Sequence, residues 1–276
     1  MLETTTNLKT MLADPTLLET RAYVGGEWIG GDKGTFDVTN PARGDVIAQV
    51  ADLSREQVGV AIAKAEVAQK EWAKWSAKER SAVMRTWFNL MMENQDDLGI
   101  ILTAEMGKPL AEAKGEIAYG ASFVEFFAEE AKRIYGETIP GHQRDKRITV
   151  LKQPIGVAAS ITPWNFPNAM ITRKAAPALA AGCAFIARPA ELTPLSATAI
   201  AVLAERAGFP AGVFQVVTTS DAPSTGQEFC ENPIVRKLTF TGSTAVGRIL
   251  LAQAADQVMK CSMELGGNAP FIVFDD

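Results

Sequence analysis

A regular alternation of short apolar segments with helical segments runs from about Val157 to Glu264 and limits the fold more than any other feature of the chain. Apolar runs of the length of buried strands occupy residues 157–161, 184–187, 213–217, 237–240 and 260–264. Helical patterns lie between them, at residues 167–181, 194–207, 222–231 and 243–255. This alternation predicts an α/β fold with a doubly wound, mostly parallel sheet, which binds ligands at the carboxyl ends of its strands.

The first half of the chain predicts short strands followed by long helices. Residues 23–50 contain glycine pairs and an Asn-Pro step, which are typical of strands joined by turns. Ser54 with Gln57, and Ser76 with Glu79, have the spacing of capping boxes at helix starts. Apolar residues at helical spacing then predict one buried stripe, formed by Val58, Ile62, Ala65, Ala68, Trp72 and Trp75. A further helix is expected from residue 109 to about 133, and residues 147–153 alternate like an extended hairpin arm.

Composition narrows the possible partners and chemistry. A net charge of -5 over 276 residues supplies no broad basic field, so neither nucleic acid nor an anionic membrane is expected as a partner. No apolar run approaches the roughly 20 residues that span a bilayer, and the N-terminus lacks the apolar core of a secretory signal, so a cytoplasmic location is expected. Cys183, Cys230 and Cys261 form no paired pattern and His142 is the only histidine, so no metal site is predicted.

A loop with two prolines directly follows the strand predicted at 157–161. Pro163 and Pro167 restrict the backbone around Asn165 and so hold its amide group at the strand end. An amide donor fixed in advance can stabilise a developing oxyanion without reorganisation. The alternative is a rigid loop in which Asn165 caps the next helix.

The next predicted strand is followed by an Arg-Pro-Ala-Glu segment at residues 188–191. The Arg188 guanidinium and the Glu191 carboxylate on one strand-end loop suit the hydroxyls of a cofactor ribose, because a carboxylate accepts their hydrogen bonds. The alternative is an ion pair on the protein surface.

A third segment passes from a predicted strand into a helix at Gly242 and Ser243 and continues to Gly247. Free backbone N–H groups at the helix start, the Ser243 hydroxyl and the helix dipole together form an anion site suited to a pyrophosphate. The segment is not the GxGxxG dinucleotide fingerprint, and without a Gly-Lys-Ser/Thr sequence it is not a Walker P-loop.

The last predicted strand ends in Glu264, and Gly266 and Gly267 follow. A carboxylate at the end of a buried strand suits a general base, and glycines let the backbone approach a ligand closely. The alternative is a structural glutamate that is bonded to backbone groups.

In this combination and order the segments resemble the aldehyde dehydrogenase superfamily, and the resemblance covers the chain from about Tyr23. Residues 38–41, 107–110 and 271–276 extend it. Residues 87–93, 139–143 and 170–174 are similar to the succinate-semialdehyde dehydrogenase branch.

The resemblance assigns roles to individual residues. It implies that Asn165 is the oxyanion donor and that Glu264 is the base that activates the deacylating water. It implies that Arg173 pairs with a distal carboxylate of the substrate, for which a bidentate guanidinium is suited; a solvent-exposed helix charge is the alternative. It implies contacts with a nicotinamide dinucleotide, NAD or NADP, for Ile161, Thr162, Pro163, Trp164, Arg188, Pro189, Ala190, Glu191, Gly226, Gly242, Ser243, Val246 and Leu265.

The resemblance also implies a domain organisation with a Rossmann-like core. Residues 1–22 are expected to be an N-terminal extension, and 23–265 an NAD(P)-binding domain with N-terminal helices and a β-hairpin oligomerisation arm near 141–155. Residues 266–276 are expected to begin a catalytic domain that is truncated in this chain. The arm predicts a homo-oligomer. Residues 271–274 predict an apolar strand of that domain, and without its partners we expect exposed hydrophobic surface and self-association.

The activity implied for an intact family member is the NAD(P)-dependent oxidation of a small carboxylated aldehyde, succinate semialdehyde to succinate. This reaction needs a thiolate that attacks the aldehyde, and the family's cysteine lies beyond Asp276. Cys261 should point away from Glu264, because strand side chains alternate. We therefore expect the chain alone to be inactive. The alternative is a catalytically dead dinucleotide-binding or assembly module from a truncated gene.

Three positions depart from the family pattern near the cofactor. Arg188 stands where the family usually has lysine, and a planar guanidinium is not equivalent to an ammonium group. Residues 218–222 replace a turn in which relatives tend to have glycines, and Asp221 would repel a phosphate that it faces. Glu191 stands where NADP-preferring relatives often have a small residue, and its carboxylate repels a 2′-phosphate. These positions favour NAD over NADP, although Arg188 can act in the opposite direction.

Overall fold

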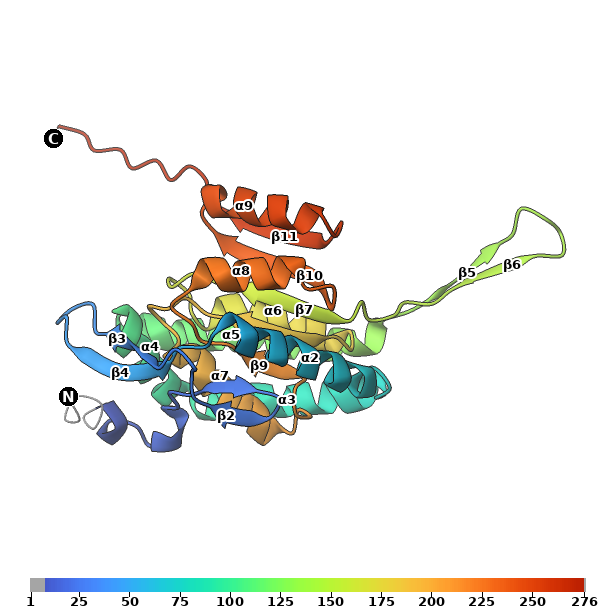
Figure 1. The fold of residues 1–276 in the computed structure, drawn as a ribbon. Coiled ribbons are helices and arrows are strands. Elements are labelled where there is room, and N and C mark those ends of the chain that lie inside the picture. Colours follow the sequence, from blue (N-terminus) through green and yellow to red (C-terminus); the bar gives the residue numbers. More distant parts are fainter. Residues whose placement is uncertain (1–7, 276) are drawn as a thin grey trace.

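The computed structural model describes residues 8–275, and in this part of the chain the strands of the largest sheet run in the order β11-β10-β7-β8-β9-β1-β2 (Figure 1). Its parallel strands are β7 (Val157–Ile161), β8 (Ala184–Arg188), β9 (Phe214–Val216), β10 (Val235–Gly242) and β11 (Lys260–Leu265). Two antiparallel strands, β1 (Ala22–Val24) and β2 (Glu27–Ile29), extend it at one edge. The prediction of a doubly wound, mostly parallel α/β fold is confirmed.

Helices cover both faces of this sheet (Figure 1). One face is covered by α2 (Arg55–Trp72), α8 (Ala222–Glu231) and α9 (Thr244–Ala255). The other face is covered by α6 (Ala169–Ala180) and α7 (Leu195–Ala207). Outside these two pack α3 (Ala77–Glu93), α4 (Gln95–Met106) and α5 (Leu110–Glu130). Short 3₁₀ helices are η1 (Pro15–Leu17) and η2 (Ala131–Arg133).

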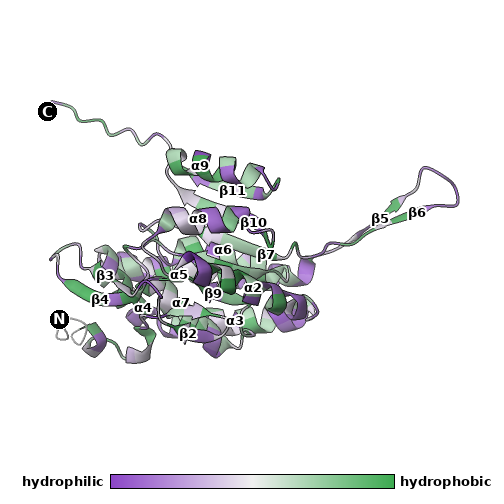
Figure 2. Ribbon diagram, in the orientation of Figure 1, coloured by the Kyte–Doolittle hydropathy of each residue, from purple (hydrophilic) through white to green (hydrophobic). Residues whose placement is uncertain are grey.

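The strands β7 and β8 in the middle of the sheet are buried on both faces, and for this reason they are mostly apolar, with Ser160 and Arg188 as the polar residues (Figure 2). Side chains alternate between two hydrophobic clusters: Phe185 and Ala187 face α6 and α7, whereas Ala184 and Ile186 face α2. The indole N–H of Trp87 on α3 donates to the Ile200 carbonyl at 3.0 Å, which satisfies a buried polar group.

Local signals placed the helix starts of the N-terminal half correctly. Both predicted capping boxes are present, at Ser54 with Gln57 and at Ser76 with Glu79. The predicted stripe along α2 is confirmed: Val58, Ile62, Ala65 and Trp72 are fully buried, and Ala68 and Trp75 are partly buried.

Two hairpins lie outside the main sheet. β3 (Thr35–Thr39) pairs with β4 (Val46–Ala51), and β5 (Glu137–Pro140) pairs with β6 (Arg147–Val150). The second hairpin is the predicted arm, and it extends far from the body of the protein (Figure 1). Its first strand begins at Glu137, before the arm boundary of 141 that was expected from the sequence.

The two ends of the chain differ in how they are packed. Residues 1–7 of the expected N-terminal extension and residue 276 lie outside the described residues, but Leu8, Leu12 and Leu17 of the extension pack into the core. The strand predicted at residues 271–274 is not formed, because no described strand lies beside it to exchange backbone hydrogen bonds. The expected hydrophobic exposure is confirmed there, with Phe271 91% exposed. Among the described helices, none has the length and apolarity to cross a membrane.

Candidate functional site

The parallel register brings the polar segments to one edge of the sheet. Ile161 at the end of β7 lies opposite Arg188 at the end of β8 and opposite Phe240 near the end of β10. Gly242 at the end of β10 lies opposite Leu265 at the end of β11. The loops that follow these strands therefore lie at one edge, where doubly wound sheets bind ligands.

The loop after β7 holds the Asn165 side chain without using it to cap α6. The Thr162 backbone N–H donates to the Arg188 carbonyl at 3.2 Å, which joins this loop to the end of β8. Asn168, rather than Asn165, is the N-cap residue of α6. Thr162 Oγ1 and Asn165 Oδ1 are buried and have no hydrogen-bond partner among the described residues. Trp164 is half-exposed beside them.

A buried ion pair, which the sequence did not reveal, fixes this loop. Lys108 Nζ lies 2.5 Å from Glu116 Oε2, 3.1 Å from the Asn165 carbonyl oxygen and 3.7 Å from the centre of the Phe166 ring. Glu116 Oε1 accepts hydrogen bonds from the Asn168 and Ala169 backbone N–H groups, at 3.0 and 3.2 Å. A carboxylate on α5 thus caps α6, and its lysine partner holds the segment that carries Asn165.

The next helix is capped in the same way. Glu105 on α4 is fully buried and accepts hydrogen bonds from the backbone N–H groups of Leu195 and Ser196, at 2.7 and 2.8 Å. Burial raises the pKa of Glu105 to about 8 against the effect of these bonds. This contact fixes the start of α7, and with it the loop that follows β8.

The Arg188–Glu191 pair predicted on the loop after β8 is formed between a buried arginine and a half-exposed glutamate. Arg188 is only 3% exposed, and its Nη2 donates to Glu191 Oε2 at 2.8 Å and to the Thr219 carbonyl at 3.1 Å. Its Nε is buried without a partner among the described residues. Burial lowers the pKa of Arg188, against the charges of Glu191 and Asp221. Pro189 and Ala190 are buried behind the pair.

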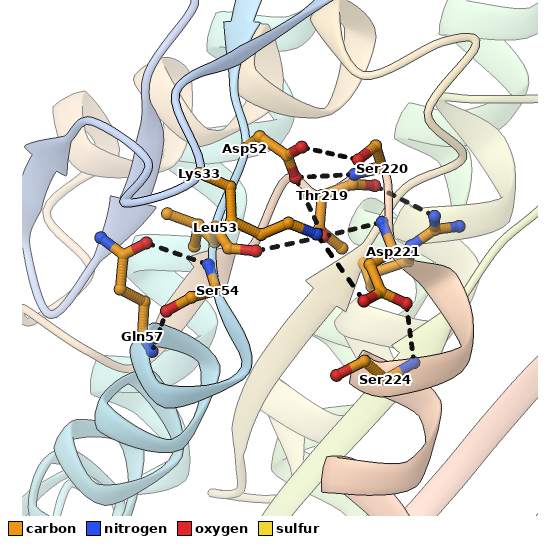
Figure 3. A network of polar contacts seen from close by, with 10 residues as sticks. Lys33, Asp52, Leu53, Ser54, Gln57, Thr219, Ser220, Asp221 and Ser224 are labelled. Carbon is orange, nitrogen blue, oxygen red and sulfur yellow. Dashed lines mark hydrogen bonds and ion pairs between the residues drawn. The ribbon is translucent and has the colours of Figure 1, made fainter.

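Beside this pair, the turn after β9 belongs to a polar network with the segment that precedes α2 (Figure 3). Asp52 accepts hydrogen bonds from the Ser220 backbone N–H at 2.9 Å and from the Ser220 hydroxyl at 2.6 Å. Asp221 caps α8 by accepting from the Ser224 backbone N–H at 3.1 Å. Contacts with a distant part of the chain therefore fix the turn at residues 218–222, where the sequence is expected to depart from the family pattern.

The start of α9 differs from the starts of α6, α7 and α8. Carboxylates of Glu116 and Asp221 cap α6 and α8, and the buried carboxyl group of Glu105 caps α7. The exposed hydroxyl of Ser243 caps α9, accepting from the Val246 backbone N–H at 3.3 Å. A negative cap, as at α6 and α8, opposes a second anion at the same helix end. Among these four described helices, only α9 therefore has a start that is capped without a carboxyl group and is exposed to an anion.

The glycines and Leu265 bring the elements around α9 close together. A Cβ on Gly247 would lie 2.6 Å from the Leu265 side chain, so α9 packs directly against the end of β11. A Cβ on Gly226 would lie 3.1 Å from Leu250 and 3.7 Å from Ile161. Gly226 is therefore buried where α8, α9 and the end of β7 meet. Val246 and Ser243 are exposed beside it.

Glu264 and Arg173 share a cleft of about 580 Å³. The cleft is lined by side chains of α5, α6, β10 and β11 and by the segments that precede β7 and β8. Lys174, the neighbour of Arg173 on α6, donates from Nζ to Thr239 Oγ1 at 3.1 Å. Burial, followed by the charge of Arg173, lowers the pKa of Lys174 to about 8, against the effect of Glu264.

The cysteines are placed as structural residues. Burial raises the pKa of Cys183, and it raises that of Cys230 to about 11. Cys261 packs against the cluster beneath α8 and α9, whereas Glu264 faces the cleft on the other side of the sheet, which confirms the predicted alternation. Burial also raises the pKa of Cys261. No group of metal-binding side chains is found among residues 8–275.

Some of the predicted site residues therefore contact each other or line the same cleft, whereas others share only their position at the carboxyl edge of the sheet. Arg173 and Glu264 line one cleft, and Arg188 contacts Glu191. Asn165 and Ser243 lie on loops at the same edge as Glu264, and no contact among these three is found in the described residues. Sequence reasoning assigned no role to Lys108 or Lys174; the only signal was a lysine within the Gly-Lys-Pro and Arg-Lys motifs.

Known proteins resemble the chain over nearly its whole length. It is 61% identical to the glutarate-semialdehyde dehydrogenase of Pseudomonas aeruginosa and 60% identical to the succinate-semialdehyde dehydrogenase [NADP(+)] GabD of Escherichia coli. Each alignment covers 96% of this chain and 55% of the relative, so the chain spans about half the length of these relatives. A crystal structure of an aldehyde dehydrogenase from Brucella melitensis superposes with a TM-score of 0.93 at 58% identity, over 96% of this chain and 55% of that one. The sequence pattern of the aldehyde dehydrogenase family matches residues 28–276, and the chain belongs to that family.

Proposed function

We propose that this chain binds a nicotinamide dinucleotide at the carboxyl edge of its sheet and that the intact enzyme oxidises a small carboxylated aldehyde, with succinate semialdehyde as the first substrate to test. The observation that carries the proposal is the start of α9, which has an exposed hydroxyl as its cap, whereas carboxyl groups occupy the starts of α6, α7 and α8. A pyrophosphate fits there for electrostatic reasons.

The residues at this edge fit the rest of such a cofactor. Thr162 Oγ1, Asn165 Oδ1 and Arg188 Nε are buried polar atoms without partners among the described residues, and native proteins rarely leave such atoms unpaired. The carboxylate of Glu191 is half-exposed, which supports the proposal that it accepts hydrogen bonds from ribose hydroxyls. A bound nicotinamide supplies the acceptor for a hydride. Because Glu191 repels a 2′-phosphate, we propose NAD as the preferred cofactor, in contrast to the NADP(+) in the name of the E. coli relative.

The cleft suits an aldehyde with a distal carboxylate. Arg173 and Lys174 line it, and a guanidinium binds a carboxylate through two hydrogen bonds. The names of both relatives, glutarate- and succinate-semialdehyde dehydrogenase, denote substrates of this kind. The presence of Arg173 and Glu264 in the lining of one cleft supports this proposal over the alternative of a solvated charge on α6.

Two side chains are placed for the chemical step. We propose that the Asn165 amide donates to the oxygen on which negative charge develops, and that Glu264 takes a proton from water in the cleft. Neither task supplies a nucleophile, and the pKa values of Cys183, Cys230 and Cys261 are all raised. Because a thiol with a raised pKa is a poor nucleophile, we expect residues 1–276 alone to bind cofactor without turnover.

The exposed hairpin of β5 and β6 supports a second proposal, that the chain assembles with other copies of itself. Ile139 and Ile148 lie opposite each other on the hairpin and are both exposed. If dinucleotide binding is absent while assembly occurs, the chain functions as an assembly module rather than as the cofactor half of an enzyme.

The test of the cofactor site is a change of the α9 cap. Ser243→Asp keeps a good helix cap but adds the carboxylate that the neighbouring helices have, whereas Ser243→Asn keeps a neutral cap. Calorimetric titration with NAD+ should show binding for the wild type and for Ser243→Asn, and its loss for Ser243→Asp. Equal affinities for the two variants would contradict a pyrophosphate at α9.

A further inference from the structure

We propose that Asp221, which Asp52 holds in position through the turn after β9, is a specificity determinant that acts with Glu191 against the 2′-phosphate of NADP. The proposal rests on the proposed dinucleotide function, and it assigns the discrimination to two carboxylates on two different loops.

The turn that carries Asp221 lies beside the ribose loop. β8 and β9 are neighbouring parallel strands, with Ala187 opposite Val216, so the loops that follow them emerge side by side. The Arg188 guanidinium joins the loops, because one nitrogen donates both to Glu191 on its own loop and to the Thr219 carbonyl on the other. Figure 3 shows the Asp221 side chain directed toward Ser224 and Lys33.

A buried carboxylate from a distant part of the chain fixes the turn. Asp52 is 6% exposed and receives hydrogen bonds from Ser220, at 2.9 Å from the backbone and 2.6 Å from the hydroxyl, and from the Thr219 hydroxyl at 3.2 Å. The Thr218 hydroxyl also donates to the Ala51 carbonyl at 2.7 Å. Burial raises the pKa of Asp52, but these bonds and the nearby Lys33 charge outweigh it, so the pKa lies below its ordinary value and the carboxylate is charged.

The Asp221 carboxylate is held by its own turn and remains open to a ligand. Its backbone N–H donates to Thr219 Oγ1 at 3.0 Å, and its Oδ1 caps α8 through Ser224. Its side chain is 44% exposed, and Lys33, at 3.6 Å, is also exposed and neutralises it only partly. The charges of Asp221 and Glu191 both act on Arg188 and raise its pKa against the effect of burial, so both carboxylates lie near that side chain.

Two carboxylates beside the ribose loop act oppositely on the two cofactors. Ribose hydroxyls donate hydrogen bonds to carboxylates, whereas a 2′-phosphate is repelled by each of them. The turn 218–221 of this chain adds a second negative group, and the Asp52 contacts prevent it from moving away.

The proposal is tested by calorimetric titration of the whole chain with NAD+ and with NADP+ at low and high salt. Asp221→Asn removes the charge and keeps a residue that caps helices equally well. We expect NADP+ to bind about tenfold more tightly to this variant, and NAD+ affinity to change by less than about threefold. The wild-type preference for NAD+ should also decrease with salt, because exposed charges are screened.

Two further variants make the result specific. Asp52→Asn replaces the carboxylate that accepts from Ser220 with an amide and should make the turn at residues 218–221 mobile. The ratio of NAD+ to NADP+ affinity should then fall although Asp221 is unchanged. Asp45→Asn removes an exposed carboxylate far from the turn and should leave both affinities unchanged. If Asp52→Asn does not fold, Asp221→Asn decides alone. Binding of NAD+ with an unchanged NADP+ to NAD+ ratio in Asp221→Asn overturns this inference alone; a wild type that binds neither dinucleotide overturns the proposed function as well.

Discussion

Replacing Glu116 with alanine should destabilise the protein more than any change at an exposed ion pair. Glu116 is about 1% exposed, and its carboxylate contacts the Lys108 ammonium group and two backbone N–H groups at the start of α6. Its removal leaves a buried lysine charge without a partner and two buried donors without acceptors. Breaking a buried pair in this way costs about 3–5 kcal/mol, which is a large part of the roughly 5–15 kcal/mol that stabilises an ordinary domain.

A comparison within the same network gives this prediction its specificity. Lys108→Met removes the ammonium group but leaves both backbone bonds to Glu116, so we expect a loss of about 1–3 kcal/mol. Asp45→Ala breaks an exposed pair with Arg43 and should not shift the unfolding midpoint. Urea unfolding followed by circular dichroism measures all three. Hydrogen exchange at residues 162–170 should accelerate in Glu116→Ala, because the segment that carries Asn165 loses its anchor. A cost below about 1 kcal/mol with unchanged exchange would refute the assigned role.

Three further predictions follow from burial and exposure. The pKa of Glu105 is raised from 4.5 to about 8, so the stability that this group contributes is complete below about pH 4.5 and is lost as the pH rises through about 8. Urea titrations between pH 5 and 8.5 should therefore show a decline in stability for the wild type and a flatter curve for Glu105→Gln. A parallel decline in the variant would contradict this prediction. The chain incubated with succinate semialdehyde and NAD+ should form no NADH, and steady formation that Cys261→Ser abolishes would show that the assignment of the cysteines is wrong. The exposed apolar side chains of residues 271–274 should cause self-association in sedimentation at high concentration, reduced by Phe271→Ser with Phe274→Ser, and a monodisperse wild-type monomer would disprove this.

Local signals made much of the fold predictable from the sequence. The capping residues Ser54 and Ser76 mark helix starts through bonds to residues three positions away, so their pattern is visible in a short window. The strands at 157–161 and 184–187 are apolar because both of their faces are covered, and their boundaries differ from the observed ones by no more than one residue. The shared edge followed from the parallel topology alone.

Long-range contacts of the site could not be predicted. Glu116 and Glu105 lie in long helices, where a glutamate is usually a charged residue that faces solvent. Glu116 instead caps a helix 52 residues further along the chain, and Glu105 caps one 90 residues further along. Asp52 likewise contacts Ser220 across 168 residues. The apolar run at 271–274 is exposed, as expected for a strand without its partners, because apolarity favours a strand only where another strand completes its hydrogen bonds.

A shared dinucleotide site requires that several strand ends form one crevice, and the hydrogen-exchange footprint of NAD+ tests this most directly. We predict that saturating NAD+ slows exchange together at residues 161–165, 188–191 and 243–247 and leaves the hairpin at residues 137–150 unchanged. Protection confined to a single one of these segments, or found only in the hairpin, would contradict a shared dinucleotide site.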